Sequence, residues 1–103
     1  FLEDFMEREN EDLIYDVENT IKLYEKCNCR IANVTRDMLD RLGYQKALAK
    51  LVVSADIQKG FKCLIEHGYI NNTFEALIVK YANMFSKSEV DAAKFRLENY
   101  KEL

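Results

Sequence analysis

Residues 11–26 read EDLIYDVENTIKLYEK, and the spacing of the apolar residues in this stretch decides the fold class. The apolar side chains recur at the three- and four-residue intervals that place them on one face of an α-helix. They share a sector of about 100° on a helical wheel, and they are Leu13, Ile14, Val17, Ile21 and Tyr24. The pattern predicts an amphipathic helix over residues 11–26. The apolar segment at residues 2–6 is either a separate helix or the first turns of this one.

Two further stretches, LDRLGY at 39–44 and LIEHGY at 64–69, share a pattern that ends helices. Each places Gly at the left-handed position after the helix and Tyr one residue later, where it can touch the Leu near the helix end. This arrangement is typical of the Schellman motif. We therefore expect one helix to end before Gly43 and another before Gly68.

The same helical spacing continues between and after these endings. We expect Thr35 to cap the helix that ends at Gly43, and a helix over residues 44–55 to follow it. Asp56 would then begin the helix that ends at Gly68.

The remaining chain predicts two more helices. Asn71 or Asn72 is expected to cap a helix over residues 74–85, and Ser86 and Glu89 match a capping box that opens the last one. No alternating run favours a strand. The expected fold is all-α, a compact bundle of five to six short helices forming a single domain over residues 1–103. We expect this domain to be excised from a longer protein, because the chain begins without Met and ends inside a helical pattern.

Composition excludes several classes of protein. The chain has 103 residues, which is the size of one domain, and it lacks an apolar run of the ~18 residues that a membrane span needs. Its three cysteines include a Cys27-x-Cys29 pair too close for a comfortable disulfide, so reduced thiols and a cytoplasmic location are expected. The only histidine is His67, and no phosphate-binding loop, zinc-protease or nucleophile-elbow motif occurs. We expect no enzymatic activity and assign no catalytic residue.

A metal site is a more specific chemical hypothesis than enzymatic activity. Cys27, Cys29, Cys63 and His67 would supply three thiolates and one imidazole, an acceptable tetrahedral set for zinc. The four-residue spacing of Cys63 and His67 puts both on one side of a helix, beside Gly60, which lets another element approach. Against this, a C-x-C half-site is less usual than C-x-x-C, and cysteine often fills small gaps in helical cores. The sequence favours this filler role, with His67 near the surface at a helix end. We therefore assign no metal ligand and no cofactor, and keep a zinc-stabilised module as an alternative.

Charge is distributed unevenly along the chain. Residues 1–25 hold nine acidic and two basic side chains, whereas residues 26–62 have a basic excess. The acidic segment either packs beside the basic one or leaves it free to meet a partner. Lys46 and Lys50, one turn apart on one helix face, are the candidate contacts for a partner, including the phosphates of a nucleic acid.

Two large aromatic residues lie away from the apolar faces of their helices. Tyr15 is opposite the face of the first helix, and Phe95 is opposite that of the last. Aromatic residues are enriched at the cores of protein interfaces, although a helix between two neighbours would bury both faces. We take Tyr15 and Phe95, with Lys46 and Lys50, as candidate interaction residues.

In size and helix number the expected bundle resembles the death-fold interaction modules, a likeness of format that serves as an analogy. The leading hypothesis is a regulatory or scaffolding protein-interaction domain of a larger intracellular protein. Its partner would be another protein or another domain of the parent chain, without membrane contact. The alternative is an accessory domain of a nucleic-acid enzyme that contacts RNA or DNA.

Overall fold

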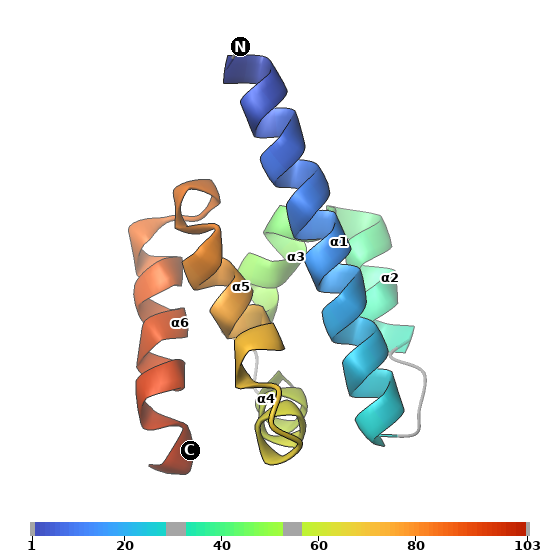
Figure 1. Cartoon of the computed structure of the whole chain (residues 1–103), viewed down its shortest axis with the longest axis vertical. Helices are drawn as coiled ribbons and strands as arrows, with labels where there is room; N and C mark the ends of the chain where they lie inside the picture. The colour runs from blue at the N-terminus through green and yellow to red at the C-terminus, as the bar shows by residue number, and fades with distance from the viewer. Residues whose placement is uncertain (1, 29–32, 53–56, 103) are drawn as a thin grey trace.

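The computed structural model describes the backbone of residues 2–28, 33–52 and 57–102, and the side chains of residues 10–27, 33–52 and 60–101. Within these residues the chain forms six α-helices and three short 3-10 helices, with no strand (Figure 1). The elements are α1 (Leu2–Asn28), α2 (Asn33–Leu42), α3 (Tyr44–Leu51), α4 (Ile57–Glu66), η1 (Ile70–Asn72), α5 (Phe74–Lys80), η2 (Ala82–Met84), α6 (Lys87–Asn99) and η3 (Tyr100–Glu102). Its radius of gyration of 13.2 Å is that of a compact domain of this length. The predicted all-α bundle is confirmed.

The first helix is longer than the sequence predicts, with 27 residues. The apolar segment at residues 2–6 belongs to α1, because the polar residues 10–12 that follow it remain helical and simply face solvent. Further along the helix, Leu13, Val17 and Ile21 lie on one face and are at most 1% exposed. This face makes α1 the helix on which α3, α4 and α5 pack.

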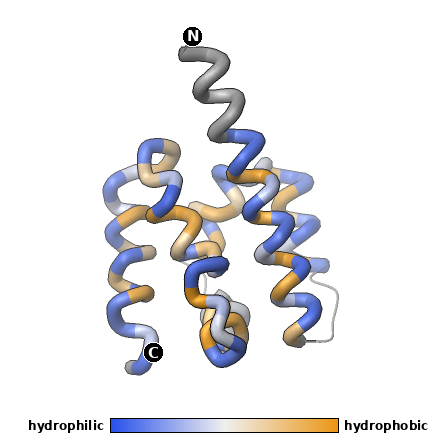
Figure 2. The backbone as a smooth tube through the Cα atoms, in the orientation of Figure 1, coloured by the Kyte–Doolittle hydropathy of each residue, from blue (hydrophilic) through white to orange (hydrophobic). Residues whose placement is uncertain are grey.

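The core is built mainly from α1, α3 and α5, and Figure 2 shows hydrophobic positions recurring along these helices. α6 forms the outer edge of the bundle and packs mainly against α5 (Figure 1). The buried residues of the core are Leu13, Val17, Ile21, Leu39, Ala47, Leu48, Val52, Leu77, Ile78, Tyr81, Val90 and Ala93. Burial of each large aliphatic side chain contributes about 1.5–3 kcal/mol to stability. Among the described helices, none has both the length and the apolar composition that crossing a membrane requires.

Both glycine endings form where the sequence predicts them, but in two different ways. Gly43 and Gly68 have positive φ angles of 82° and 83°. At Gly68 the full Schellman pattern is present: the Gly68 N–H donates to Ile65 (3.0 Å) and the Tyr69 N–H to Leu64 (2.8 Å). At Gly43 the ending is the simpler left-handed motif, in which the Gly43 N–H donates to Leu39 at 2.8 Å. The difference arises because the residue after Gly43 already begins α3.

Two of the three predicted caps are wrong. α2 begins at Asn33, so Thr35 lies inside the helix and does not cap it. The cap of α5 is Thr73, whose Oγ1 accepts a hydrogen bond from the Ala76 N–H at 3.1 Å. The two asparagines predicted for this role form η1 instead. The capping box at the start of α6 is confirmed, with both of its hydrogen bonds present.

Two helices end earlier than their periodicity predicts. α3 ends at Leu51, and Asp56 lies outside the described residues. α5 ends at Lys80, because Tyr81 leaves the helical region (φ −106°, ψ 41°) and η2 follows. The early end of α5 places Tyr81 in the core.

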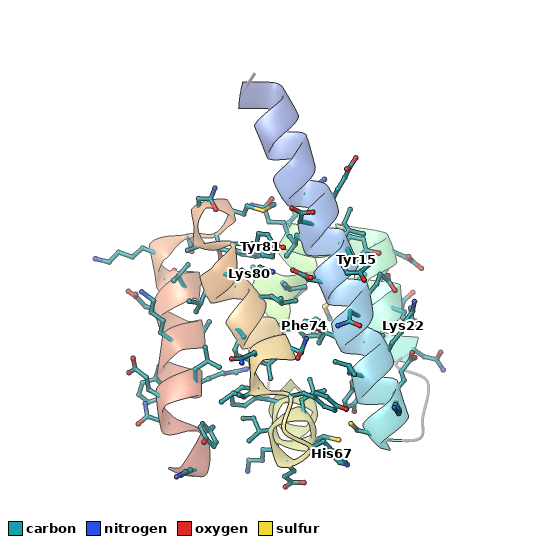
Figure 3. All side chains as sticks on the ribbon, in the orientation of Figure 1. Tyr15, Lys22, His67, Phe74, Lys80 and Tyr81 are labelled. Carbon is teal, nitrogen blue, oxygen red and sulfur yellow. The ribbon has the colours of Figure 1, made fainter. Side chains whose placement is uncertain are left out.

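A polar cluster joins α1 to the end of α5. The Tyr81 hydroxyl and the Lys80 ammonium both donate to Asp16 Oδ2, at 2.6 and 2.8 Å, and Figure 3 shows both side chains between α5 and α1. Burial acts to raise the pKa of Asp16, but these two hydrogen bonds outweigh it and the pKa is lowered. Burial, together with the bond to Asp16, raises the pKa of Tyr81 to about 12. The cluster therefore holds a carboxylate against the edge of the core.

Candidate functional site

The structure brings three metal-ligating side chains together at one end of the bundle. One ligand atom each from Cys27, Cys63 and His67 lies within 4.8 Å of the other two. Cys27 is in the last turn of α1, Cys63 is in α4, and His67 directly follows the end of α4, where Figure 3 labels it. Cys29, the fourth residue of the sequence hypothesis, lies outside the described residues. Because the cysteines come from separate helices, this cluster depends on tertiary packing.

Local contacts explain why these helices meet at this point. Gly60 lies one turn before Cys63 and faces the ring of Tyr24, which lies one turn before Cys27. A Cβ atom on Gly60 would be 3.4 Å from Tyr24 Cε2. The tyrosine ring thus packs directly over the glycine, and the next turn of each helix brings the two thiols together.

The Cys27–Cys63–His67 cluster contains two half-buried thiols and an exposed imidazole that one hydrogen bond holds in place. His67 is exposed, and its Nδ1–H donates to the Cys63 carbonyl oxygen at 2.8 Å. This hydrogen bond selects the tautomer in which Nε2 carries the free lone pair. Burial raises the pKa of the Cys63 thiol, and the neighbouring Cys27 and Glu66 add to the rise. The donor set matches the thiolate and imidazole ligands of zinc.

Tyr15 lies on a continuous exposed strip of α1. Its side chain is 74% exposed, and Figure 3 shows Tyr15 and Lys22 on the side of α1 away from α5. We call this strip the Tyr15 ridge. Its residues, all exposed, are Glu11, Asp12, Tyr15, Asn19, Lys22 and Lys26. Since α1 packs its other faces on the bundle, the aromatic ring is the apolar centre of a polar surface.

Phe95 is also exposed, but on a different part of the molecule. It is 60% exposed on α6, which α5 separates from α1 in Figure 1. Internal packing therefore does not account for either Tyr15 or Phe95. Lys46 and Lys50 are exposed together on α3. The four predicted interaction residues thus lie on three different helices, α1, α3 and α6.

The acidic and basic segments of the chain neutralise each other in part. Arg36 of α2 donates to Glu25 at 2.6 Å and to Glu18 at 3.2 Å, both on α1. The hydrogen bond to Glu25 is the main reason that the pKa of Arg36 is raised. Within α2, Arg41 pairs with Asp37 at 3.0 Å. Arg36 therefore joins the basic segment to the acidic one, whereas Arg41 pairs at the exposed surface of α2.

A buried acidic residue went unrecognised in the sequence. Glu75 of α5 is 1% exposed and lies 3.8 Å from the guanidinium of Arg96 on α6. Burial raises the pKa of Glu75 to about 7, against the opposing effect of Arg96. The only sequence signal was its place beside the apolar residue Phe74 at the start of a short helix.

Comparison with known proteins adds no further information on function. No protein-family model, no curated protein and no solved structure matches this chain.

Proposed function

We propose that this chain is a protein-interaction module of a cytoplasmic protein, and that the Tyr15 ridge on α1 is its binding surface. The exposure of Tyr15, at 74%, is the observation that carries the proposal. A large aromatic side chain is enriched at interface cores and is typical of the residues that dominate binding energy. The likeness in format to death-fold modules agrees with this class of function.

The charges of the Tyr15 ridge indicate which charges a complementary partner would carry. Glu11 and Asp12 lie on one side of Tyr15 along the helix, and Lys22 and Lys26 lie on the other. A complementary partner would offer an apolar pocket for the ring, with basic groups facing the acidic pair and acidic groups facing the lysines. The partner is another protein or another domain of the parent chain.

The paired arginines favour a protein partner over a nucleic acid. Arg36 and Arg41 already contact carboxylates, so neither presents a full unpaired charge to a phosphate backbone. Lys46 and Lys50, one turn apart on α3, make a small electrostatic surface by themselves when compared with the charged faces of nucleic-acid-binding domains. Contact with RNA or DNA therefore stays the second candidate, and its test is given in the Discussion.

The experiment compares the chain with its Tyr15→Ala variant as bait for interacting proteins. Any protein retained by the unmodified chain is then purified, and its affinity for both baits is measured. Truncation of an interface anchor costs more than ~1 kcal/mol, so Tyr15→Ala should weaken binding by at least about fivefold. Because Tyr15 is exposed, its loss should leave the melting temperature unchanged.

Phe95→Ala is the matched control, since it removes an exposed aromatic ring from the other side of the bundle. The proposal expects this variant to bind the partner as the unmodified chain does. Loss of binding with Phe95→Ala alone would move the site to α6 and overturn the proposal. Equal affinity of all three chains for every retained partner would overturn it as well.

A further inference from the structure

The Cys27–Cys63–His67 cluster has no role in the proposed interaction, and we propose that it binds one Zn²⁺ ion. This inference does not rest on the proposed function. Its ligand atoms lie within 4.8 Å of one another. A tetrahedral zinc site places two sulfurs about 3.8 Å apart and a sulfur and a nitrogen about 3.6 Å apart. A contraction of about 1 Å would therefore convert the observed cluster into a coordination site.

The positions of the ligands allow this contraction. Cys27 lies in the last turn of α1, and His67 follows the last residue of α4. The imidazole is exposed, so a small shift of the His67 side chain toward the thiols would displace no core residue. Cys63 is fixed within α4, one turn after Gly60, which packs against the ring of Tyr24 on α1.

The surroundings of the cluster favour a bound cation. Two helices end at this point, and the C-terminal end of a helix carries partial negative charge from its unpaired carbonyl groups. The hydrogen bond from His67 Nδ1–H to the Cys63 carbonyl orients the ring and leaves Nε2 available. Ligating histidines in proteins are commonly held by such a second hydrogen bond.

The donor set selects zinc over the hard divalent cations. Two thiolates and one imidazole are soft and borderline ligands, whereas Mg²⁺ and Ca²⁺ take oxygen ligands. Two deprotonated thiols also balance the charge of the ion. Three protein ligands leave one coordination position, which a water molecule fills in sites of this kind. Cys29 lies outside the described residues, and the proposed site does not use it.

The physical consequence of binding is a cross-link between the ends of α1 and α4. An ion that binds only the folded chain raises the free energy of unfolding. The increase grows with the logarithm of the ratio between the free ion concentration and the dissociation constant. Since α4 packs directly against α1, and α1 carries part of the core, zinc would raise the melting temperature of the domain.

The experiment uses the full chain, expressed in zinc-supplemented medium and purified with a reductant. Native mass spectrometry should show one zinc ion per chain. A chelator should remove the ion and lower the melting temperature, and added Zn²⁺ should restore both. Replacement by Co²⁺ should give the visible absorption of a tetrahedral ion and the near-ultraviolet bands of thiolate ligation.

Ligand variants then test which residues bind the ion. Loss of an outer-sphere partner of a metal ligand weakens binding by about 10- to 100-fold, so loss of a ligand should exceed about 100-fold. We expect this for Cys63→Ser and for His67→Asn, measured by competition with a zinc indicator. His67 is exposed, so His67→Asn remains informative if Cys63→Ser does not fold.

The matched controls are Cys29→Ser and Glu66→Gln, which should keep one zinc ion per chain with unchanged ligation bands. A bare chain under reducing conditions, with no change in melting temperature on addition of Zn²⁺, would overturn the proposal. A disulfide between Cys27 and Cys63 in air, with no zinc bound under reductant, would do the same. Zinc binding that survives His67→Asn, or that is lost in Cys29→Ser, would assign a different ligand set and equally overturn it.

Discussion

Replacement of Glu75 by glutamine should stabilise the protein above neutral pH. Glu75 is almost fully buried, and burial raises its pKa from 4.5 to about 7 in spite of the nearby Arg96. Glutamine has the shape of the protonated acid and carries no charge. The variant therefore avoids the cost of holding a buried carboxylate.

The pKa values set the size and sign of this effect. Because the folded pKa lies above the unfolded one, the folded chain takes up a proton between these values. The contribution of Glu75 to stability is therefore largest below about pH 4.5 and is lost as the pH rises to about 7. The rise in pKa, at ~1.4 kcal/mol for each unit, corresponds to about 3 kcal/mol. We expect Glu75→Gln to be more stable than the unmodified chain by an amount of this order near pH 8, and equally stable near pH 4.

Urea denaturation of both chains across this pH range measures the difference. Glu98→Gln, an exposed change on α6, is the matched control and should show no such dependence. A Glu75→Gln variant less stable than the unmodified chain near pH 8 would refute the reasoning. It would mean that the attraction between Glu75 and Arg96 outweighs the cost of burying the charge.

Three other changes test the fold and the alternative function. Gly68→Ala should cost ~1–2 kcal/mol in urea denaturation, because φ is +83° although a Cβ atom there would meet nothing within 4 Å. Phe95→Ala should change the unfolding free energy by less than about 0.5 kcal/mol, whereas Phe61→Ala, at 2% exposure, should cost ~3–5 kcal/mol. If the chain binds RNA or DNA, affinity should fall steeply with added salt, and the double change of Lys46 and Lys50 to Glu should abolish it. No measurable binding at low salt would remove that function.

Local signals in the sequence predict the helices and several of their ends. A glycine at positive φ acts within a few residues, so the endings at Gly43 and Gly68 follow from short patterns. The start of α5 is ambiguous in the sequence, because Asn71, Asn72 and Thr73 are all residues that cap helices well. In the structure the cap is Thr73, while the asparagines lie in η1 and the Asn72 carbonyl accepts from Thr20 of α1. A contact such as this last one, between residues far apart in the sequence, is not readable from a local pattern.

The candidate sites also combine features that local sequence predicts with features that depend on tertiary packing. The spacing of Cys63 and His67 on one helix is readable from sequence, but their approach to Cys27 requires the packing of α1 on α4. The sequence favours cysteine as core filler, because a C-x-C half-site is unusual and cysteine often fills helical cores. The exposure of Tyr15 and Phe95 likewise depends on which helix faces have neighbours.

The edge position of α6 has a consequence for the order in which the protein opens. α6 packs mainly on α5, with Val90 and Ala93 as its buried residues, so its detachment would leave the contacts of α1 with α3, α4 and α5 in place. Elements of this kind exchange their amide hydrogens through local opening, at a lower free energy than global unfolding. Detachment of α6 would also expose Glu75, and the released carboxyl group ionises more readily in water. Amide exchange in α6 should therefore accelerate with pH beyond the intrinsic chemical rate, while exchange in the buried half of α1 should not.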